Sequence, residues 1–192
     1  MLTNDFDSHL PEELIAQIPL IDRSASRLLI VNRTSNSLVH ETFNNITEYL
    51  REGDVMVFNQ SKVIPARFYG VRDDTNGKVE ILLLRKIKHS IWQALARPGR
   101  RLRPGTSISI LDKEGERSGI QIEVTESDMH GIKTIRMSTE NYIDRLGHMP
   151  LPPYIHEKLE DPARYQTVYA KETGSVAAPT AGLHFSHDTM KD

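Results

Sequence analysis

The sequence predicts a discontinuous α/β domain interrupted by an inserted small antiparallel β-barrel, so the fold class is α/β plus all-β. Three observations lead to this prediction. The chain has 192 residues, a length that suits one large domain or two small ones. Six short β segments come one after another between residues 66 and 137 with no helical pattern between them. Mixed helix and strand patterns flank them, which predicts an α/β domain of residues 1–59 and 149–192 around a barrel domain of residues 60–148.

The segment before the barrel is expected to contain a short helix, a hairpin and a strand. Pro11 and the two acidic residues after it suit the first turn of a helix over residues 11–17. The apolar runs at 28–31 and 37–43 are separated by the turn-forming sequence NRTSN, which predicts a β-hairpin. The run VMVFN at 55–59 predicts a buried strand.

The barrel is predicted from short β segments separated by turns. The six segments are ARFYGV, VEILLL, IWQALA, SISIL, GIQIEV and GIKTIRM, and the turns include DDTNG, RPGRRLRPG and DKEGE. Segments of this length and spacing, without helices between them, are typical of small antiparallel barrels. Closure of the barrel would remove the exposed edges of the sheet.

Two helices are expected after the barrel. The first, over residues 139–147, should end with Gly147 just past its last turn, where glycine is favoured. The second, over residues 161–170, should begin with Asp161 as its cap and a proline at the first helical position. Between them, the proline-rich sequence MPLPPYI at 149–155 predicts an extended, stiff connection.

The last part of the chain adds two expectations. The second helix would place Tyr165, Val168 and Tyr169 on one face, which is the ordinary spacing of core residues. The final residues have the pattern of a helix that starts with Ser186 as its cap and then stops. A C-terminally truncated chain is therefore expected.

The composition limits the classes of function. A formal charge of −2 gives no overall attraction to nucleic acid, so any RNA contact must come from a local patch. The absence of cysteine excludes disulfides, thiolate zinc sites and a cysteine nucleophile, and it agrees with a reducing compartment. Neither a secretory leader nor an apolar run long enough to span a membrane is found. A cytoplasmic protein without membrane attachment is expected.

Familiar cofactor and metal motifs are missing as well. The sequence has no G-x-G-x-x-G turn, no P-loop and no G-x-S-x-G elbow. His184 and His187 stand three residues apart, but no evident third ligand accompanies them. Neither a metal site nor a permanently bound cofactor is therefore expected.

A basic run is the one local patch that suits RNA. From Ile81 to Leu111 there is no Asp or Glu, and the run carries seven positive charges: Arg85, Lys86, Lys88, Arg97, Arg100, Arg101 and Arg103. Such a run is also what an ordinary solvated protein face contains. The sequence leaves both interpretations open.

The segment GSVAAPTAGLHF at 174–185 is the most unusual part of the chain. Its small residues would let a ligand approach the backbone closely, so that amide groups hold a nucleoside or a carboxylate. Thr180 and His184 add polar side chains to it. The alternative is a tightly packed loop between a helix and a strand, and composition does not decide between the two.

Four runs of sequence resemble the S-adenosylmethionine:tRNA ribosyltransferase-isomerase family of queuosine biosynthesis, in order and spacing. They are LPEELIAQIPL with DRSASRLL (10–29), GDVMVFNQSKVIPARFYG (53–70), ARPGRRLRPG (96–105), and MPLPPYI with YQTVYAKETGSVAAPTAGLHF (149–185). The resemblance implies the same fold, an α/β domain with an inserted barrel.

The resemblance also implies an activity and its partners. The ribosyl moiety of S-adenosylmethionine, a co-substrate, would be transferred and isomerised onto 7-aminomethyl-7-deazaguanine at the wobble position of tRNA. The product would be epoxyqueuosine, with adenine and methionine released. A monomer is expected.

The resemblance further implies a set of site residues. The sulfonium acidifies the C5′ hydrogens of the donor, so a base is needed there, and His184 is the candidate, with Thr180 beside it. The alternative for His184 is a hydrogen-bonded residue that fixes the loop. The substrate-binding candidates are Arg27, Asn59, Lys62, Arg67, Pro179, Ala181, Gly182 and Phe185, and ion pairs or core packing are their alternative roles. The tRNA-binding candidates are Arg97, Arg100, Arg101 and Arg103, with Trp92 nearby.

Two departures from the family pattern stand out. Where the family commonly has N-D-T-R before V-I-P-A-R, this chain has Asn59, Gln60, Ser61 and Lys62, which removes a carboxylate and replaces a guanidinium by an ammonium. Family members also continue well past the PTAGLHF motif. The competing interpretations are therefore a non-catalytic RNA-binding module and an inactive truncated fragment of the enzyme.

Overall fold

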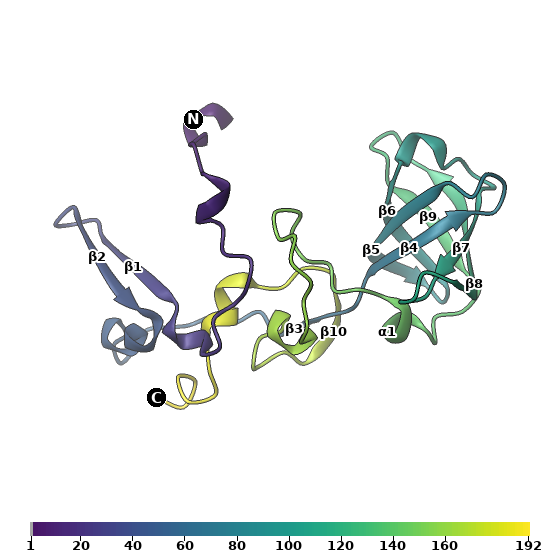
Figure 1. Ribbon diagram of the computed structural model, residues 1–192. Helices are drawn as coiled ribbons and strands as arrows, with labels where there is room; N and C mark the ends of the chain where they lie inside the picture. The colour runs from purple at the N-terminus through teal and green to yellow at the C-terminus, as the bar shows by residue number, and fades with distance from the viewer. Residues whose placement is uncertain (1) are drawn as a thin grey trace.

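The computed structural model of the protein describes residues 2–192, and a closed six-stranded antiparallel barrel forms one end of it (Figure 1). The strand order is β4-β5-β6-β9-β8-β7, and β7 pairs with β4 to close the ring. The strands are β4 (Arg67–Arg72), β5 (Lys78–Lys88), β6 (Ile91–Arg97), β7 (Ser107–Leu111), β8 (Arg117–Ser127) and β9 (Lys133–Met137). All six predicted strands, and the barrel they were predicted to form, are confirmed.

The barrel interior is the main hydrophobic core. Side chains alternate along each strand, so that in β5 Val79, Ile81 and Leu83 are buried and their neighbours are not. Other core residues are Phe68, Trp92, Ala94, Leu102, Ile108, Ile110, Ile120, Ile122, Val124, Ile135 and Met137. Gly70 is required within β4, because a Cβ there would lie 2.7 Å from the carbonyl oxygen of Ser109 on β7.

The two ends of the barrel differ in what they face. The near end holds the β5–β6 turn, the turn at 112–116 and the chain that leads to the rest of the molecule, where Arg67 pairs with His148. The far end holds the loops 73–77, 98–105 and 128–132 and points away from the rest of the chain (Figure 1).

Short elements make up the remainder of the chain. The hairpin of β1 (Arg27–Asn32) and β2 (Ser37–Thr42) is antiparallel, as predicted, and β3 (Ser61–Val63) pairs in parallel with β10 (Glu172–Ser175). Within residues 2–192, the α-helical conformation is confined to α1 (Ile143–Leu146). The 3₁₀ turns are η1 (Thr3–Phe6), η2 (Glu12–Leu14), η3 (Arg23–Ala25), η4 (Phe43–Tyr49), η5 (Gly99–Arg101), η6 (Pro162–Tyr165) and η7 (Thr180–His184).

The prediction of a buried strand at 55–59 is wrong. These residues are extended but belong to no ladder, and the side chains of Val55 and Val57 are 87% and 93% exposed. A strand needs hydrogen-bonding neighbours, and none lies beside this segment among residues 2–192. The apolar pattern of a strand can be recognised from the residues of the segment itself, whereas the presence of a neighbouring strand cannot.

The predicted helices are present only as single turns. The helix at 11–17 is reduced to η2, and that at 139–147 to α1. At 161–170, the Asp161 side chain caps η6 as expected, accepting a hydrogen bond of 2.9 Å from the amide of Ala163, but the helix ends at Tyr165. The face predicted to carry Tyr165, Val168 and Tyr169 therefore does not exist.

Gly147 is needed for a different reason from the one predicted. Its φ is −72°, so it does not adopt the left-handed conformation of a helix-terminating glycine. A Cβ at this position would lie 1.8 Å from the carbonyl oxygen of Pro65. The glycine therefore permits close contact between α1 and the entry to β4.

No helix among residues 2–192 combines the length and apolar character that crossing a membrane would require.

Candidate functional site

The small-residue segment forms η7 and lies on a cluster of aromatic rings. Phe185 packs edge-on against Phe43, with ring centroids 4.8 Å apart, and against Phe58 at 5.3 Å. Phe58 in turn packs edge-on against Tyr169 at 5.0 Å, and the His184 ring lies 5.5 Å from Phe43. This aromatic cluster joins η4, the segment before β3 and the segment before β10.

Gly182 is the tightest point of the site. It is buried, and a Cβ built there would lie 2.1 Å from the hydroxyl oxygen of Tyr169 and 3.0 Å from Cγ2 of Thr167. Its amide donates a 2.8 Å hydrogen bond to the carbonyl of Pro179. Burial also raises the pKa of the Tyr169 hydroxyl above its usual value. Only glycine fits where η7 meets this tyrosine.

The two candidate catalytic residues lie at opposite ends of η7. Thr180 begins the turn and is exposed, whereas His184 ends it and is half-buried against Phe43. Among residues 2–192, no group hydrogen-bonds to the imidazole of His184. The alternative in which a hydrogen bond from His184 fixes the loop therefore finds no support in the geometry.

The other residues predicted in this segment surround the same turn. Pro179 and Phe185 are half-buried, and Ala181 is exposed. Arg27 opens β1 directly after Ser26, whose carbonyl accepts the amide of Phe43, so it lies close to the aromatic cluster. Asn59 comes directly after Phe58 of the cluster, and its side chain accepts a 2.9 Å hydrogen bond from the amide of Ser61.

Lys62 and Arg67 lie further along the chain. Lys62 is exposed on β3, opposite Thr173 of β10. Arg67 opens β4 and donates to the carbonyl of Leu151 at 3.1 Å, and its Nε lies 3.0 Å from a carboxylate oxygen of Glu80. The Leu151 carbonyl and the Glu80 carboxylate therefore already contact the guanidinium of Arg67, although its buried Nε has no partner with hydrogen-bond geometry within residues 2–192.

Gln166 was not predicted from the sequence, although it holds this region together. Its side-chain amide accepts from the Val63 amide at 2.9 Å and donates to the Val63 carbonyl at 2.7 Å. Its own carbonyl accepts from Arg23 at 3.1 Å. The side chain thus pairs with β3 as a neighbouring strand would, across 103 residues of sequence. No local pattern could have revealed this pairing.

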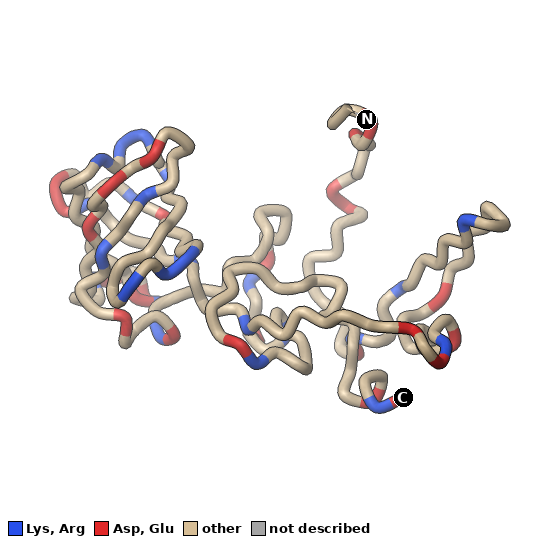
Figure 2. Tube along the Cα trace, turned by 180° about the vertical axis from the view of Figure 1, so that it is seen from behind, with Lys and Arg blue, Asp and Glu red and all other residues tan. Residues whose placement is uncertain are grey.

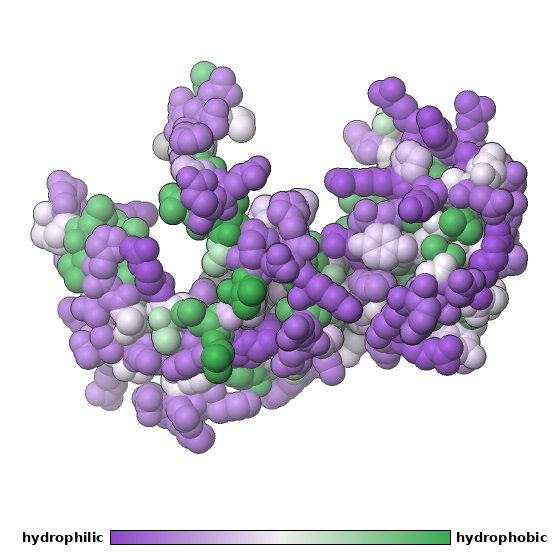
Figure 3. Space-filling view, in the orientation of Figure 1, coloured by the Kyte–Doolittle hydropathy of each residue, from purple (hydrophilic) through white to green (hydrophobic). Residues whose placement is uncertain are grey.

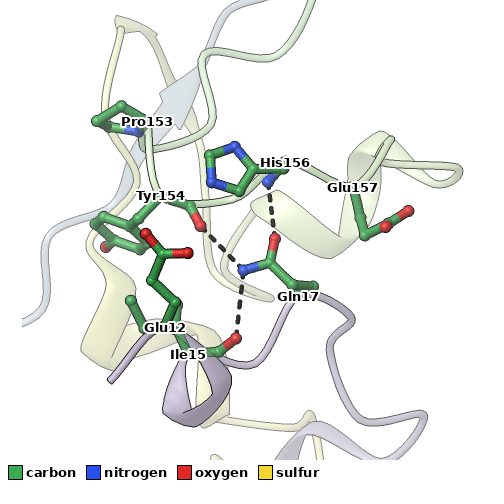
Figure 4. A pocket seen from close by; sticks show the side chains of 7 residues that line it. All are labelled: Glu12, Ile15, Gln17, Pro153, Tyr154, His156 and Glu157. Carbon is green, nitrogen blue, oxygen red and sulfur yellow. Dashed lines mark hydrogen bonds between the residues drawn. The ribbon is translucent and has the colours of Figure 1, made fainter. Parts of the chain in front are cut away.

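Gln17 makes a similar connection beside an open pocket (Figure 4). Its amide nitrogen donates to the Tyr154 carbonyl at 3.0 Å, and its oxygen accepts from the His156 amide at 2.8 Å. The pocket is lined by Glu12, Ile15, Gln17, Pro153, Tyr154, His156 and Glu157. None of the residues predicted as site residues lines it.

The basic run at 85–103 is divided between the two ends of the barrel. The β5–β6 hairpin carries Lys86 to the near end, where its ammonium pairs with Glu140. Arg97 ends β6, and Arg100, Arg101 and Arg103 follow in the 98–105 loop at the far end. Figure 2 shows the positive residues of the barrel in blue. None of the ion pairs formed among residues 2–192 includes any of these four arginines.

The prediction that Trp92 belongs to an RNA-contacting surface is wrong. Trp92 is 5% exposed inside the barrel, and its indole N–H donates to Glu140 at 2.7 Å. Burial opposes ionisation of Glu140, but the hydrogen bonds from Lys86, Trp92 and the Ser90 amide outweigh it and lower the pKa. Trp92 is a core residue, so no base can stack on it.

No group of three or more His, Cys, Asp or Glu side chains suited to a metal ion occurs within residues 2–192.

The sequence of the chain was compared with protein families and with known proteins. A family model described as "Queuosine biosynthesis protein" matches residues 3–192 of the chain. The chain belongs to this family. Two relatives with curated descriptions are similar along the whole of this chain.

Two such relatives come from strains of Dehalococcoides mccartyi. The one from strain CBDB1 is 52% identical over 191 residues, and the one from strain ATCC BAA-2100 / JCM 16839 / KCTC 5957 / BAV1 is 49% identical over 191 residues. Both are described as S-adenosylmethionine:tRNA ribosyltransferase-isomerase. Each alignment covers 100% of this chain and 55% of the relative, so the chain spans about half the length of the curated relatives it matches.

A solved structure is also similar. It is the crystal structure of an S-adenosylmethionine tRNA ribosyltransferase from Thermotoga maritima, with 30% sequence identity and a TM-score of 0.38. The match covers 97% of this chain and 52% of that one.

Proposed function

We propose that the chain is part of a tRNA-modifying enzyme that transfers and isomerises the ribosyl moiety of S-adenosylmethionine onto 7-aminomethyl-7-deazaguanine in tRNA. Adenine and methionine are the by-products, and epoxyqueuosine is the product. The observation that carries the proposal is the 52% identity, over the whole of this chain, to a relative described with that transferase-isomerase activity. The reaction takes place in the cytoplasm and uses S-adenosylmethionine as a co-substrate.

The surface around η7 is the proposed site of the reaction. The tight packing of Gly182 on Tyr169 fixes the turn, and Thr180 and Ala181 remain exposed beside it. Exposed backbone and a hydroxyl there suit a nucleoside or a carboxylate. Arg27 and Lys62, which are exposed, supply positive charge for the carboxylate or phosphate groups of the substrates.

His184 is proposed as the base that removes a proton from C5′ of the donor. An imidazole that no protein group within residues 2–192 occupies is available to a substrate, and neutral imidazole accepts a proton near neutral pH. The flanking ring of Phe43, 5.5 Å away, shields one side from water. In an active family protein, His184→Ala should lower turnover by about 10²–10⁴-fold, and a loss within about tenfold would exclude the assignment.

The reaction itself is tested by adenine release. The chain is mixed with S-adenosylmethionine and tRNA carrying 7-aminomethyl-7-deazaguanine, and adenine is measured by mass spectrometry beside a full-length relative. Release would place all the essential groups within this chain. Absence of release, with an active control, would reject the activity for these residues alone.

We also propose that residues 1–59 and 149–192 form one discontinuous domain around residues 60–148. Hydrogen bonds between distant segments support this division: Gln17 with Tyr154, Arg23 with Gln166, and the Arg164 guanidinium with the Leu20 carbonyl. Contacts between η3 and η7 add to them. Hydrogen exchange should report two cooperative units, one for residues 60–148 and one for residues 1–59 with 149–192, and a single unit covering both would oppose the division.

A non-catalytic RNA-binding module is the second candidate. The four arginines towards the far end favour it, because they carry charge that no carboxylate among residues 2–192 neutralises. Salt-dependent tRNA binding without adenine release would identify this function.

An inactive fragment of the enzyme is the third candidate. Large apolar side chains are exposed outside the barrel, among them Val55, Val57 and Ile21 (Figure 3). Large exposed apolar patches mark interaction sites, so apolar side chains exposed in this number favour a missing partner. Absence of a cooperative unfolding transition outside the barrel would support this candidate.

A further inference from the structure

A lysine occupies an interior position at the far end of the barrel. In β9 the buried residues are Lys133, Ile135 and Met137, so Lys133 shares the inward face of the strand with two core residues. Its exposed fraction is 5%, and among residues 2–192 it is the only charged residue in the buried class. Its position therefore requires a physical explanation.

The ammonium of Lys133 has one neutral partner. Nζ donates a 2.6 Å hydrogen bond to the hydroxyl of Ser127. No carboxylate pairs with it in the described part of the chain. An ammonium can donate three hydrogen bonds, and burial without an opposite charge is costly. No other partner of Nζ is found among residues 2–192, so its remaining donors are available to an external anion.

A pocket at the far end of the barrel has Lys133 in its lining. Arg100 and Arg103 line it together with Lys133, Leu102, Ser127 and Asp128, in a volume of about 460 Å³. Arg100 and Arg103 are exposed, and neither takes part in an ion pair within residues 2–192. Three cations from two separate segments thus meet at one opening.

Asp128 is the only acidic residue among those that line the pocket, and backbone amides of its own loop donate hydrogen bonds to its carboxylate. One of its carboxylate oxygens accepts hydrogen bonds from the amides of His130 at 2.9 Å and Ile132 at 2.8 Å. These bonds shape the turn before β9. The pocket retains a net charge of +2, from three cations and one carboxylate.

We propose that this far-end pocket binds a backbone phosphate of RNA, with Lys133 as the buried contact and Arg100 and Arg103 as the exposed ones. The proposal deepens the proposed function, because it rests on tRNA as the substrate and adds a residue outside the basic run. A phosphate oxygen accepts several donors at once, which suits an ammonium and two guanidinium groups. Leu102 and the aliphatic part of Lys133 form the apolar floor beneath it.

The test measures tRNA binding as a function of salt. Fluorescence anisotropy of a labelled tRNA transcript is recorded over a series of KCl concentrations for the wild type, Lys133→Met and Arg103→Gln. Lys113→Met, in the β7–β8 turn at the near end, is the matched control. Lys133→Met should weaken binding by about tenfold and reduce the slope of log affinity against log salt by about one. Lys113→Met should leave both unchanged.

Methionine has nearly the length of lysine, and replacing a buried charge by an apolar side chain is often neutral for stability. Unchanged Trp92 fluorescence would show that the barrel is intact. An affinity and slope for Lys133→Met within about twofold of the wild type would overturn the site, as would a wild type that binds tRNA without salt dependence. Lys133-dependent binding without adenine release would retain the site and reject the proposed reaction, so the two failures are distinguishable.

Discussion

Gly182→Ala should destabilise the proposed site, and the structure indicates which atom causes the loss. The new Cβ would lie 2.1 Å from the Tyr169 hydroxyl oxygen, 3.0 Å from Cγ2 of Thr167 and 3.2 Å from Cζ of Tyr169. Tyr169 cannot simply rotate away, because its ring packs against Phe58 at 5.0 Å and Phe185 at 6.4 Å. Overpacking of this kind costs about 1–3 kcal/mol, or a fall in Tm of about 2–4 °C per kcal/mol for a chain of this length.

A double-mutant cycle separates this clash from a general effect of alanine. Tyr169→Phe removes the closest atom, so Gly182→Ala should cost less than half as much in that background. Gly99→Ala is the control, since a Cβ there meets nothing within 4 Å. Calorimetry gives the stability, and hydrogen exchange of residues 165–185 shows whether the loss is local. An equal cost in both backgrounds, or a cost below about 0.5 kcal/mol, would refute the packing argument.

The remaining predictions concern three polar networks. Hydrogen bonds from Ser107 and Ser109 lower the pKa of Asp73 below its usual 3.8, so its carboxylate stabilises the fold above that pH and loses this effect as the pH falls through the lowered pKa. Asp73→Asn should therefore make Tm less sensitive to acid, which a pH series of thermal melts would check. Glu140→Leu should shift the emission of Trp92, the single tryptophan, more than Glu140→Gln does, because glutamine keeps an acceptor for the indole N–H. Gln166→Leu should speed hydrogen exchange of the Val63 amide, whereas Gln166→Glu should speed it less, because glutamate keeps the acceptor for that amide although it repels the Val63 carbonyl.

The barrel was predictable because most of its signals are local. Four of its six strand pairs join neighbours in sequence: β4 with β5, β5 with β6, β7 with β8, and β8 with β9. Alternation and turn residues define such hairpins without knowledge of the rest of the chain. The basic run shows the limit of local prediction, because a hairpin that reverses within the run separates Lys86 from Arg97.

The sequence predicts longer helices than the structure contains, because a starting signal carries no information about where a helix ends. Asp161 caps a turn as expected, but continuation of the helix beyond that turn depends on partners far away in sequence. Gln166 has extended backbone angles (φ −126°, ψ 146°), and its side chain pairs with the Val63 backbone, so the helical turn ends before it. Tertiary context therefore overrode local propensity, as it regularly does for short helices.

The inward orientation of Lys133 can be predicted from the sequence. The run GIKTIRM alternates, so Lys133 has the same parity as Ile135 and Met137 and must face the same side as they do. A lysine at an inward position of a barrel strand can be accommodated only near an open end, where its ammonium reaches water or an anion. Parity thus indicates that Lys133 lies at a mouth of the barrel. Lys133 lies beside Arg100 and Arg103 only because the sheet closes through the pairing of β6 with β9. No local sequence pattern predicts that pairing.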